Sequence, residues 1–510
     1  MFLARPVSGD PGPEQPAPFD FETARARIGE SRERGDLQEL AFHCGQILIM
    51  AQKQGRRPDP DALDLLARLL LIDPEGLDIG PIMLLLRAYP RLRRVIEFDM
   101  HRLLQDDEPQ IRQILIAGLD SRVNRFGFLM VKDGVIDRFI DFTKSPYPVN
   151  ADARQRIHTV WIEATSHCNQ KCTFCPDPKR ESPRELMDLE RFKKRARELH
   201  DNFDIGYWQL NAYGEPLLHP KLGEMISFIK TELRSPAPVF FTTHGLTLTD
   251  KRIDRLLTTL PDEVMISLHN DSAESYALSR SEKIGNYQLL TDRVFRFCSS
   301  LMAGSHCCSV RLSVLVNNSN ASSCVGKDIL SAFADNPERF YRLCLYWQER
   351  VRDWAGHDGV CIRLPRLDRD AVATTFHEAN HGPEHAVVIA EWDTPAGPRI
   401  IFASPRPVGT YANLIPFQRD AGSVQRFEAS PLGCGFTRAP SLTIFANGRL
   451  GICCLDLETT ASFGHADDNE TLLGSLTSQA ISTMFADLSF GVPGSPGCSV
   501  CLGRVRDQAV

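Results

Sequence analysis

The sequence has no apolar run long enough for a membrane span. Its longest apolar stretches, such as IMLLLRAY at residues 82–89, fall well short of the ~20 residues that a transmembrane helix needs. Residues 1–20 also lack the apolar stretch of a signal peptide and are rich in proline and glycine. We therefore expect a cytoplasmic protein with no membrane partner, and a flexible tail over residues 1–20.

An excess of positive charge is absent as well. The chain has 58 Lys and Arg residues against 65 Asp and Glu, for a net charge of -7, so no basic surface for a polyanion is indicated and nucleic acid is a poor candidate partner. Its 15 cysteines cannot all pair, and disulfides are rare in a reducing compartment. Metal binding explains clustered cysteines better, while the isolated ones are expected to be core residues: Cys44, Cys298, Cys324, Cys344 and Cys361. The adjacent Cys307 and Cys308 are left unassigned.

A chain of 510 residues is too long for one ordinary core and should hold about three domains. Residues 21–155 have mainly helical periodicity, with a hairpin signal near 126–142. Over 156–370, strand-like runs alternate with amphipathic ones, and RFYRLCLYW at 339–347 is a candidate sixth strand. That alternation predicts parallel strands with crossover helices, in an α/β barrel or an open sheet. Residues 371–430 are expected to be an irregular linker, and 431–510 a small cysteine-rich α+β domain.

Three cysteines in the stretch CNQKCTFCP, namely Cys168, Cys172 and Cys175, directly follow the first expected strand of this core. Parallel α/β barrels carry their functional groups at this end of the strands. A structural zinc ion prefers four closed ligands, whereas a [4Fe-4S] cluster held by three cysteines keeps one iron open to a substrate or cofactor. The spacing alone leaves both metals possible.

Further marks in the expected order make residues 160–350 resemble the radical S-adenosylmethionine (SAM) enzymes. The C-x3-C-x2-C motif has an aromatic residue, Phe174, before its last cysteine. After the second strand comes Gly214-Glu215-Pro216, after the third FFTTHGLTLT, and in the fourth the Ser267 of MISLHND. The chain departs from the family pattern at Tyr213 and His244, and also at His269 and Asn270, and the last two put the loop after Ser267 in doubt.

The resemblance implies a partial (β/α)6 barrel that binds a [4Fe-4S] cluster on Cys168, Cys172 and Cys175, together with SAM. It implies that the Gly214-Glu215-Pro216 segment meets the SAM amino group, that Ser267 contacts SAM, and that Phe174 lies in the cofactor site. A one-electron reductant such as flavodoxin or ferredoxin would then trigger SAM cleavage to a 5′-deoxyadenosyl radical, which takes a hydrogen atom from the substrate. Asn317 is a candidate for the adenine or ribose, while Arg280 and Arg311 are either ligands of the SAM carboxylate or substrate, or packed arginines. No catalytic residue is assigned.

Four more cysteines lie near the C-terminus. Cys434 is followed by thirteen residues, Gly448, four residues and Cys453, and Cys498 and Cys501 come later. This layout resembles the auxiliary-cluster extension of radical SAM enzymes, in its smaller "twitch" form rather than the full SPASM form. It implies a second [4Fe-4S] cluster on these four thiols. A structural zinc ribbon with the same four ligands remains the alternative.

These features support three functional hypotheses. The first is a radical SAM oxidoreductase or modifying enzyme acting on a polar small molecule such as a sugar or aminocyclitol, in natural-product biosynthesis, with the auxiliary cluster taking part in electron transfer. The second is maturation of a ribosomally made peptide. The third is a zinc-stabilised binding scaffold without catalysis. The single auxiliary cluster favours the small molecule.

Overall fold

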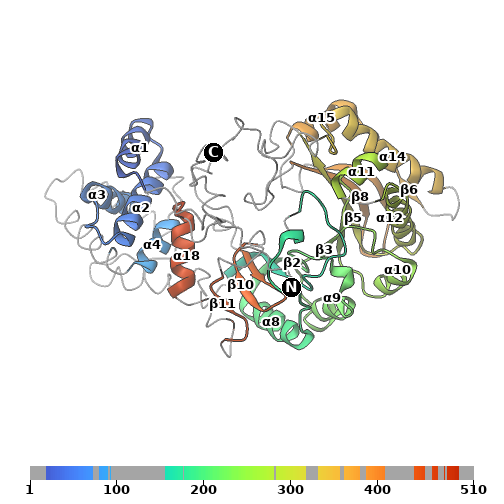
Figure 1. Cartoon of the computed structure of the whole chain (residues 1–510), viewed down its shortest axis with the longest axis horizontal. Coiled ribbons are helices and arrows are strands. Elements are labelled where there is room, and N and C mark those ends of the chain that lie inside the picture. The colour runs from blue at the N-terminus through green and yellow to red at the C-terminus, as the bar shows by residue number, and fades with distance from the viewer. Residues whose placement is uncertain are drawn as a thin grey trace, which may run out of the picture.

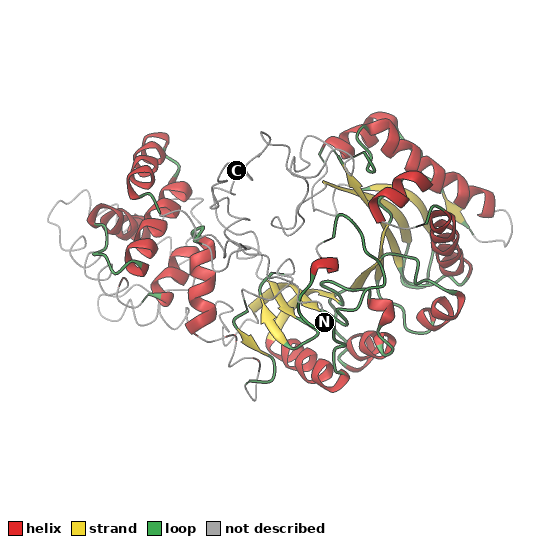
Figure 2. Ribbon diagram, viewed as in Figure 1, coloured by secondary structure: helices red, strands yellow, loops and turns green. Residues whose placement is uncertain are grey.

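The computed structural model describes two folded regions, one all-helical and one built around a sheet (Figure 1). Figure 2 shows the helices and strands of both regions. No helix in the described part of the chain is long and apolar enough to cross a membrane. The structure describes residues 19–72, 80–89, 92, 155–175, 177–280, 283–317, 331–355, 361–378, 386–407, 441–453, 462–468, 472, 476 and 479–492.

A mixed sheet forms the centre of the second region. Its strands follow the order β11-β10-β9-β1-β2-β3-β4-β5-β8-β7-β6, and those from β9 to β8 run parallel to one another. The parallel strands are β9 (Ser441–Ile444), β1 (Gln155–Ile162), β2 (Phe203–Gln209), β3 (Val239–Thr243), β4 (Glu263–Ser267), β5 (Ser309–Val316) and β8 (Arg399–Pro407). Antiparallel strands extend both edges: β7 (Val387–Trp392), β6 (Ile362–Arg363), β10 (Arg449–Gly451) and β11 (Gly464–His465). The predicted α/β class with parallel strands is confirmed.

Helices connect the parallel strands and cover the sheet. The amphipathic segment expected after the cysteine motif forms α8, which begins where the Asp188 side chain accepts the Arg191 N–H at 2.8 Å. Such a cap satisfies a backbone donor that the first helical turn leaves free. The helices of this region are α8 (Leu189–Asn202), α9 (Leu222–Ser227), α10 (Asp250–Leu257), α11 (Ala273–Arg280), α12 (Gly285–Ala303), α14 (Pro337–Ala355) and α15 (Arg369–His377).

Two sequence expectations for this region are wrong. Residues 339–347 lie in helix α14 rather than in a strand. Their buried members, Phe340, Leu343, Cys344 and Trp347, recur at helical spacing, and this periodicity outweighs the strand preference of the aromatic residues. The parallel strand next to β5 is instead β8, which with β7 lies inside the stretch expected to be an irregular linker, 371–430. The prolines at both ends of β8 are typical of loops, and they led to the expectation of a linker here.

The N-terminal helices pack around α2, whose Ile47, Leu48 and Ile49 are fully buried. The first helix is capped by Asp20, whose carboxylate accepts from the N–H of Glu22 and Thr23. The four helices are α1 (Phe21–Arg34), α2 (Leu37–Lys53), α3 (Pro60–Ile72) and α4 (Gly80–Ala88). They agree with the helical prediction, while the predicted hairpin near 126–142 lies outside the described residues.

The C-terminal helix α18 (Gln479–Ser489) joins the two regions. Its Ile481, Phe485 and Leu488 belong to the core beside the sheet. Phe490 and Val492, directly after it, belong to the core of the N-terminal helices. The segment 479–492 therefore packs against the N-terminal helices (Figure 1).

Candidate functional site

The three cysteines lie on one loop between β1 and α8. A β-bridge between Thr165 and Leu186 closes this loop. Within it the Cys175 N–H donates to the Cys172 carbonyl at 3.2 Å, which forms a tight turn around the last two cysteines. The loop thus holds all three thiols, each half-buried, at the carboxyl end of β1, where the sequence predicts them.

Burial governs the protonation of these thiols. It raises the pKa of Cys168 to about 12 and also raises the pKa of Cys175. A negative charge on Cys172 contributes to the rise in both pKa values, so the thiols are near enough to repel one another when ionised. Three thiolates in this position need positive charge to compensate them, and the irons of a bound iron-sulfur cluster would supply that charge.

The donor set fits such a cluster, since its three cysteines would bind three different irons and leave the fourth open. Across the described ranges no group of three or more His, Cys, Asp or Glu side chains is arranged to hold a single metal ion.

Arg280, at the end of α11, lies against this loop. Its Nη1 donates to the Gln170 side-chain oxygen at 2.8 Å and lies 3.5 Å from the Cys172 sulfur. Its Nη2 donates to the Ser267 carbonyl at 2.5 Å, at the end of β4. The sequence left open whether Arg280 binds a ligand or packs, and the structure brings it to the Cys172 sulfur.

Phe174 points into the protein beneath the cysteine loop. Its ring meets the edges of His269 and Phe333, with centroids 5.0 and 5.6 Å apart, and the Arg280 guanidinium lies 5.3 Å above it. Burial and the charge of Arg280 hold the pKa of His269 well below its ordinary value, so that imidazole is neutral. Phe174 therefore anchors the loop through packing, whereas its predicted contact with the cofactor stays a prediction.

The second motif, Gly214-Glu215-Pro216, crosses directly against the cysteine loop. Gly214 has φ 73, and a Cβ there would lie 2.1 Å from the Thr165 carbonyl oxygen. The Glu215 N–H donates to the His167 carbonyl at 2.8 Å. Only glycine fits this close approach, which explains its place in the motif.

The Glu215 side chain is buried and fixes the loop after β3. Its Oε1 accepts from the Thr243 and Thr247 hydroxyls at 2.7 and 2.9 Å, and its Oε2 accepts from the His244 N–H at 2.9 Å. The His244 ring also reaches the cysteine loop, with Nε2 2.8 Å from the Asn169 side-chain oxygen. The departure to histidine at 244 thus links the two loops. The predicted contact of Glu215 with an amine stays a prediction.

The remaining candidates lie at opposite ends of the parallel strands. Ser267 ends β4, and Asn317 follows β5 with its N–H donating to the Ala334 carbonyl at 2.7 Å. Both are at the end of the sheet that carries the cysteine loop. Arg311 lies near the start of β5 and pairs with Glu263 at 2.8 Å, so it is a packed ion pair.

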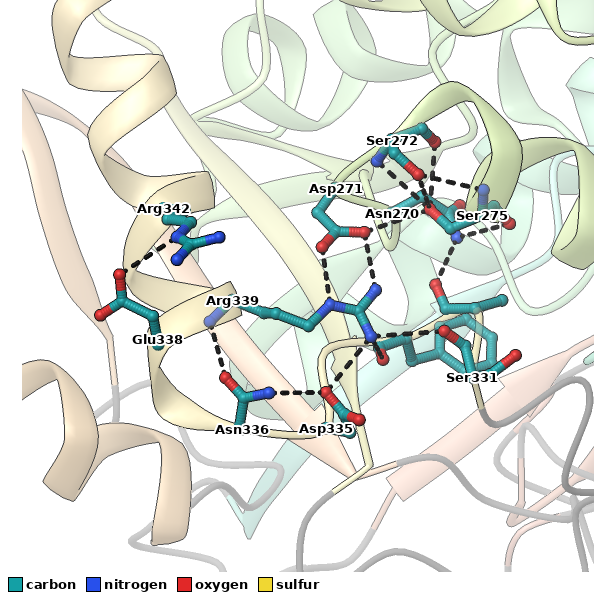
Figure 3. Close-up of polar contacts among 12 residues, drawn as sticks. Asn270, Asp271, Ser272, Ser275, Ser331, Asp335, Asn336, Glu338, Arg339 and Arg342 are labelled. Carbon is teal, nitrogen blue, oxygen red and sulfur yellow. Dashed lines mark hydrogen bonds and ion pairs between the residues drawn. The ribbon is translucent and has the colours of Figure 1, made fainter.

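Arg339 holds the backbone of Phe333, whose ring packs against Phe174. Arg339, on α14, donates from Nε and Nη2 to the two carboxylate oxygens of Asp271, at 2.7 and 2.8 Å (Figure 3). Its Nη1 donates to the Phe333 carbonyl at 2.9 Å. The loop after β4, whose sequence departs from the family pattern, is therefore tied to the residues before α14.

Sequence reasoning missed Glu163, which follows β1 and is 1% exposed. Its Oε1 accepts from the Tyr213 N–H, and its Oε2 from the Ala446 N–H, both at 3.1 Å. Arg180, beyond the cysteines, approaches Oε1 at 3.4 Å. This carboxylate joins the cysteine loop, the loop after β2 and the C-terminal hairpin. A charged residue at the end of an apolar strand is the signal that could have indicated it.

Of the four predicted auxiliary ligands, only Cys453 lies within the described residues. It lies two residues after β10, whose hairpin with β9 turns at Gly448 with φ 85, as the Asn-Gly signal predicts. Cys453 is partly buried against the sheet core. Cys434, Cys498 and Cys501 lie outside the described residues, as does Cys454.

Comparison with known proteins gives one family match. The model of the radical SAM superfamily matches residues 162–300, a stretch that contains the cysteine loop, the Gly214-Glu215-Pro216 loop and Ser267. No curated protein matches the chain.

Several solved structures resemble the chain at low similarity. BtrN in complex with AdoMet and 2-DOIA is 13% identical, covers 68% of this chain and 93% of its own, and has a TM-score of 0.36. Streptococcus suis SuiB bound to S-adenosylmethionine is 12% identical, with 79% and 82% covered and a TM-score of 0.39. The anSMEcpe enzyme with bound AdoMet and Cp18Cys peptide is 12% identical, with 69% and 92% covered and a TM-score of 0.36.

Proposed function

We propose, from the premise that residues 162–300 form a radical SAM superfamily domain of an enzyme, that the chain reductively cleaves SAM and oxidises or rearranges a polar small molecule. The cluster would be held by Cys168, Cys172 and Cys175. When bound, the cluster and SAM supply a 5′-deoxyadenosyl radical that abstracts hydrogen from the substrate. The observation that carries the proposal is the loop that gathers three half-buried thiols at the carboxyl end of β1.

The chain's own residues would bind and orient SAM and shield the site from water. Glu215 would hold the SAM amine while it keeps the loop after β3 in place, and Ser267 and Asn317, at the ends of β4 and β5, would contact the rest of SAM. The packed rings of Phe174 and Phe333 would form an apolar wall of the cofactor site, and such a wall would keep water from the reactive centre.

A second cluster is proposed on Cys434, Cys453, Cys498 and Cys501, to take part in electron transfer. What supports it is the spacing of these residues and the β9–β10 hairpin that leads into Cys453. Glu163 accepts from the turn of that hairpin and from the loop beside the cysteine site, so the two regions share a hydrogen-bonded carboxylate. A flavodoxin or ferredoxin is the proposed electron donor.

The substrate class rests on the layout of the last domain. Four auxiliary cysteines in place of a larger set favour a small polar substrate, such as a sugar or aminocyclitol, over a ribosomal peptide. Turnover of candidate sugars and of precursor peptides would separate these two. A zinc ribbon is the alternative to the second cluster at the C-terminal cysteines, and the metal content decides between the two.

Iron counting after anaerobic reconstitution tests the proposal. The wild-type chain should bind about eight irons and eight sulfides, and with dithionite and SAM it should release 5′-deoxyadenosine slowly without substrate. Replacement of Cys168, Cys172 and Cys175 together by Ala should leave about four irons and abolish SAM cleavage. A triple variant that still cleaves SAM would refute the site.

Cys453 tests the second cluster separately. Cys453→Ser should leave about four irons and stop product formation while some SAM cleavage continues, because the first cluster is intact. Cys298→Ser, a buried core thiol, is the matched control and should keep about eight irons. One zinc ion with about four irons in the wild-type chain would show that the C-terminal site is a ribbon.

A further inference from the structure

Arg280 is a buried cation with an unusual set of partners. Only 2% of its surface is exposed. Its guanidinium donates to the Gln170 side-chain oxygen, the Ser267 carbonyl and the Cys172 sulfur, of which the first two are neutral and the third is neutral as a thiol. Its Nε has no hydrogen-bond partner. Among the described residues no carboxylate forms an ion pair with it.

A buried charge without a counter-charge is costly, by several kcal/mol for an ion moved out of water. The Phe174 and Tyr276 rings, 5.3 and 5.8 Å from the guanidinium, recover part of this cost through cation-π contacts. Neutral acceptors and rings do not cancel a full positive charge. A negative charge at this position would do so, and the Cys172 thiol, 3.5 Å away, is a group able to carry one.

Arg195 shows how another buried arginine of this chain is satisfied. It is 1% exposed on α8, and its Nη1 pairs with the Glu198 carboxylate at 2.8 Å. Burial alone therefore does not explain the missing carboxylate at Arg280. The difference between the two lies in their surroundings, a surface-facing helix for Arg195 and the cysteine loop for Arg280.

The position of Arg280 is fixed from both sides. Gln170 accepts from Arg280 and in turn donates to the Tyr276 hydroxyl at 3.2 Å. The N–H and the hydroxyl of Thr173 both donate to the Ser279 carbonyl, at 2.8 and 2.7 Å. These bonds join the end of α11 to the cysteine loop, so the guanidinium cannot leave Cys172 without moving the loop.

We propose that Arg280 is the counter-charge of the cluster on Cys168, Cys172 and Cys175, and that its donation to the Cys172 sulfur raises the midpoint potential of that cluster. The inference rests on the proposed function. Reduction takes one electron from an external one-electron donor and adds one negative charge to the cluster, while no bond breaks. A fixed cation beside a ligand sulfur stabilises the reduced form more than the oxidised form. Arg280 is a positioning residue that acts through the cysteine ligand.

The test is a potentiometric titration of the reconstituted full-length protein, followed by electron paramagnetic resonance. Addition of SAM identifies the relevant signal, because only the cluster with an open iron responds to it. In Arg280→Gln we expect the ratio of reduced to oxidised cluster at a fixed potential to fall about tenfold, which is about 59 mV for a one-electron couple. Arg280→Lys keeps the charge and should shift less. Arg195→Gln is the matched control and should titrate as the wild type does.

Three results would overturn the inference. These are an unchanged midpoint in Arg280→Gln, equal shifts in the Gln and Lys variants, or loss of this cluster in both variants while circular dichroism shows them folded. The last result would make Arg280 a structural residue of the loop. Failure of the proposed function looks different, since the wild-type chain would then show no SAM-responsive cluster signal before any variant is compared.

Discussion

Buried charges are treated differently in the two regions of this molecule. At the end of the sheet, Glu163 and Glu215 are each 1% exposed, and Glu215 accepts from the Thr243 and Thr247 hydroxyls and the His244 N–H of the loop after β3. In the helical region, the buried carboxylate Asp59 pairs with Arg25, whose side chain is 59% exposed. Asp487 on α18 likewise pairs with Lys53, which is 38% exposed.

The two kinds of buried carboxylate connect different parts of the structure. An ion pair with a solvated partner adds modest stability, and in the helical region such pairs attach one helix to the next. The carboxylates at the end of the sheet instead join three loops that have no regular hydrogen-bond ladder between them. Their removal should disturb the site itself, whereas removal of the helical pairs should lower stability and leave the chemistry intact.

Glu215→Ala should have the larger effect on function. It removes a charged hydrogen-bond acceptor worth about 1.5–3 kcal/mol, which corresponds to a loss of SAM affinity of about tenfold or more. The free energy of unfolding should fall too, because the buried Thr243 and Thr247 hydroxyls lose their acceptor. Equilibrium binding of SAM to the reconstituted protein and urea unfolding measure the two effects.

Glu215→Gln sharpens this result. The amide keeps one oxygen as acceptor but cannot supply a negative charge to an amine. We expect it to unfold closer to the wild type than Glu215→Ala does, and to bind SAM as weakly. Normal SAM affinity in the Ala variant, together with reduced stability, would make Glu215 a purely structural carboxylate of the kind found in the helical region.

Sequence reasoning could predict the parts of this fold and site that depend on local patterns. Alternation of apolar and amphipathic runs indicated the parallel sheet, and the cysteine spacing indicated the loop at the carboxyl end of β1. Gly214 and Gly448 were located by their motifs, and both adopt positive φ. Each of these signals lies within a few neighbouring residues, where sterics and periodicity decide the conformation.

The rest depends on contacts between distant segments. Strand β8 takes its place beside β5 through pairing across the fold, and its flanking prolines suggested a linker instead. The bond from Arg280 to Gln170 joins residues 110 positions apart, and the bond from Ala446 to Glu163 joins residues 283 apart. The packing of α18 against the N-terminal helices is of the same kind. No local pattern records such pairings.

The smallest effect is expected at Asp59 in the helical region. Asp59 is 7% exposed, and its Oδ1 accepts from the Ala62 N–H at 3.1 Å at the start of α3, while its Oδ2 accepts from Arg25. Asp59→Ala removes both the helix cap and the pair, and should lower the free energy of unfolding by about 1–2 kcal/mol. Arg25→Met removes the pair alone and should cost about 0–1 kcal/mol, because Arg25 is largely solvated.

Asp59→Asn separates the two contributions, since its amide oxygen can still cap α3 but carries no charge, so its loss should match that of Arg25→Met. Urea unfolding followed by circular dichroism gives the stabilities, and SAM cleavage by the reconstituted variants gives the function. All three variants should cleave SAM at the wild-type rate, because the pair lies in the helical region and contacts none of the described loops around the cysteines. A cleavage rate that falls in proportion to stability would mean that the helical region and the site are coupled through α18, and the contrast between the two kinds of buried charge would then fail.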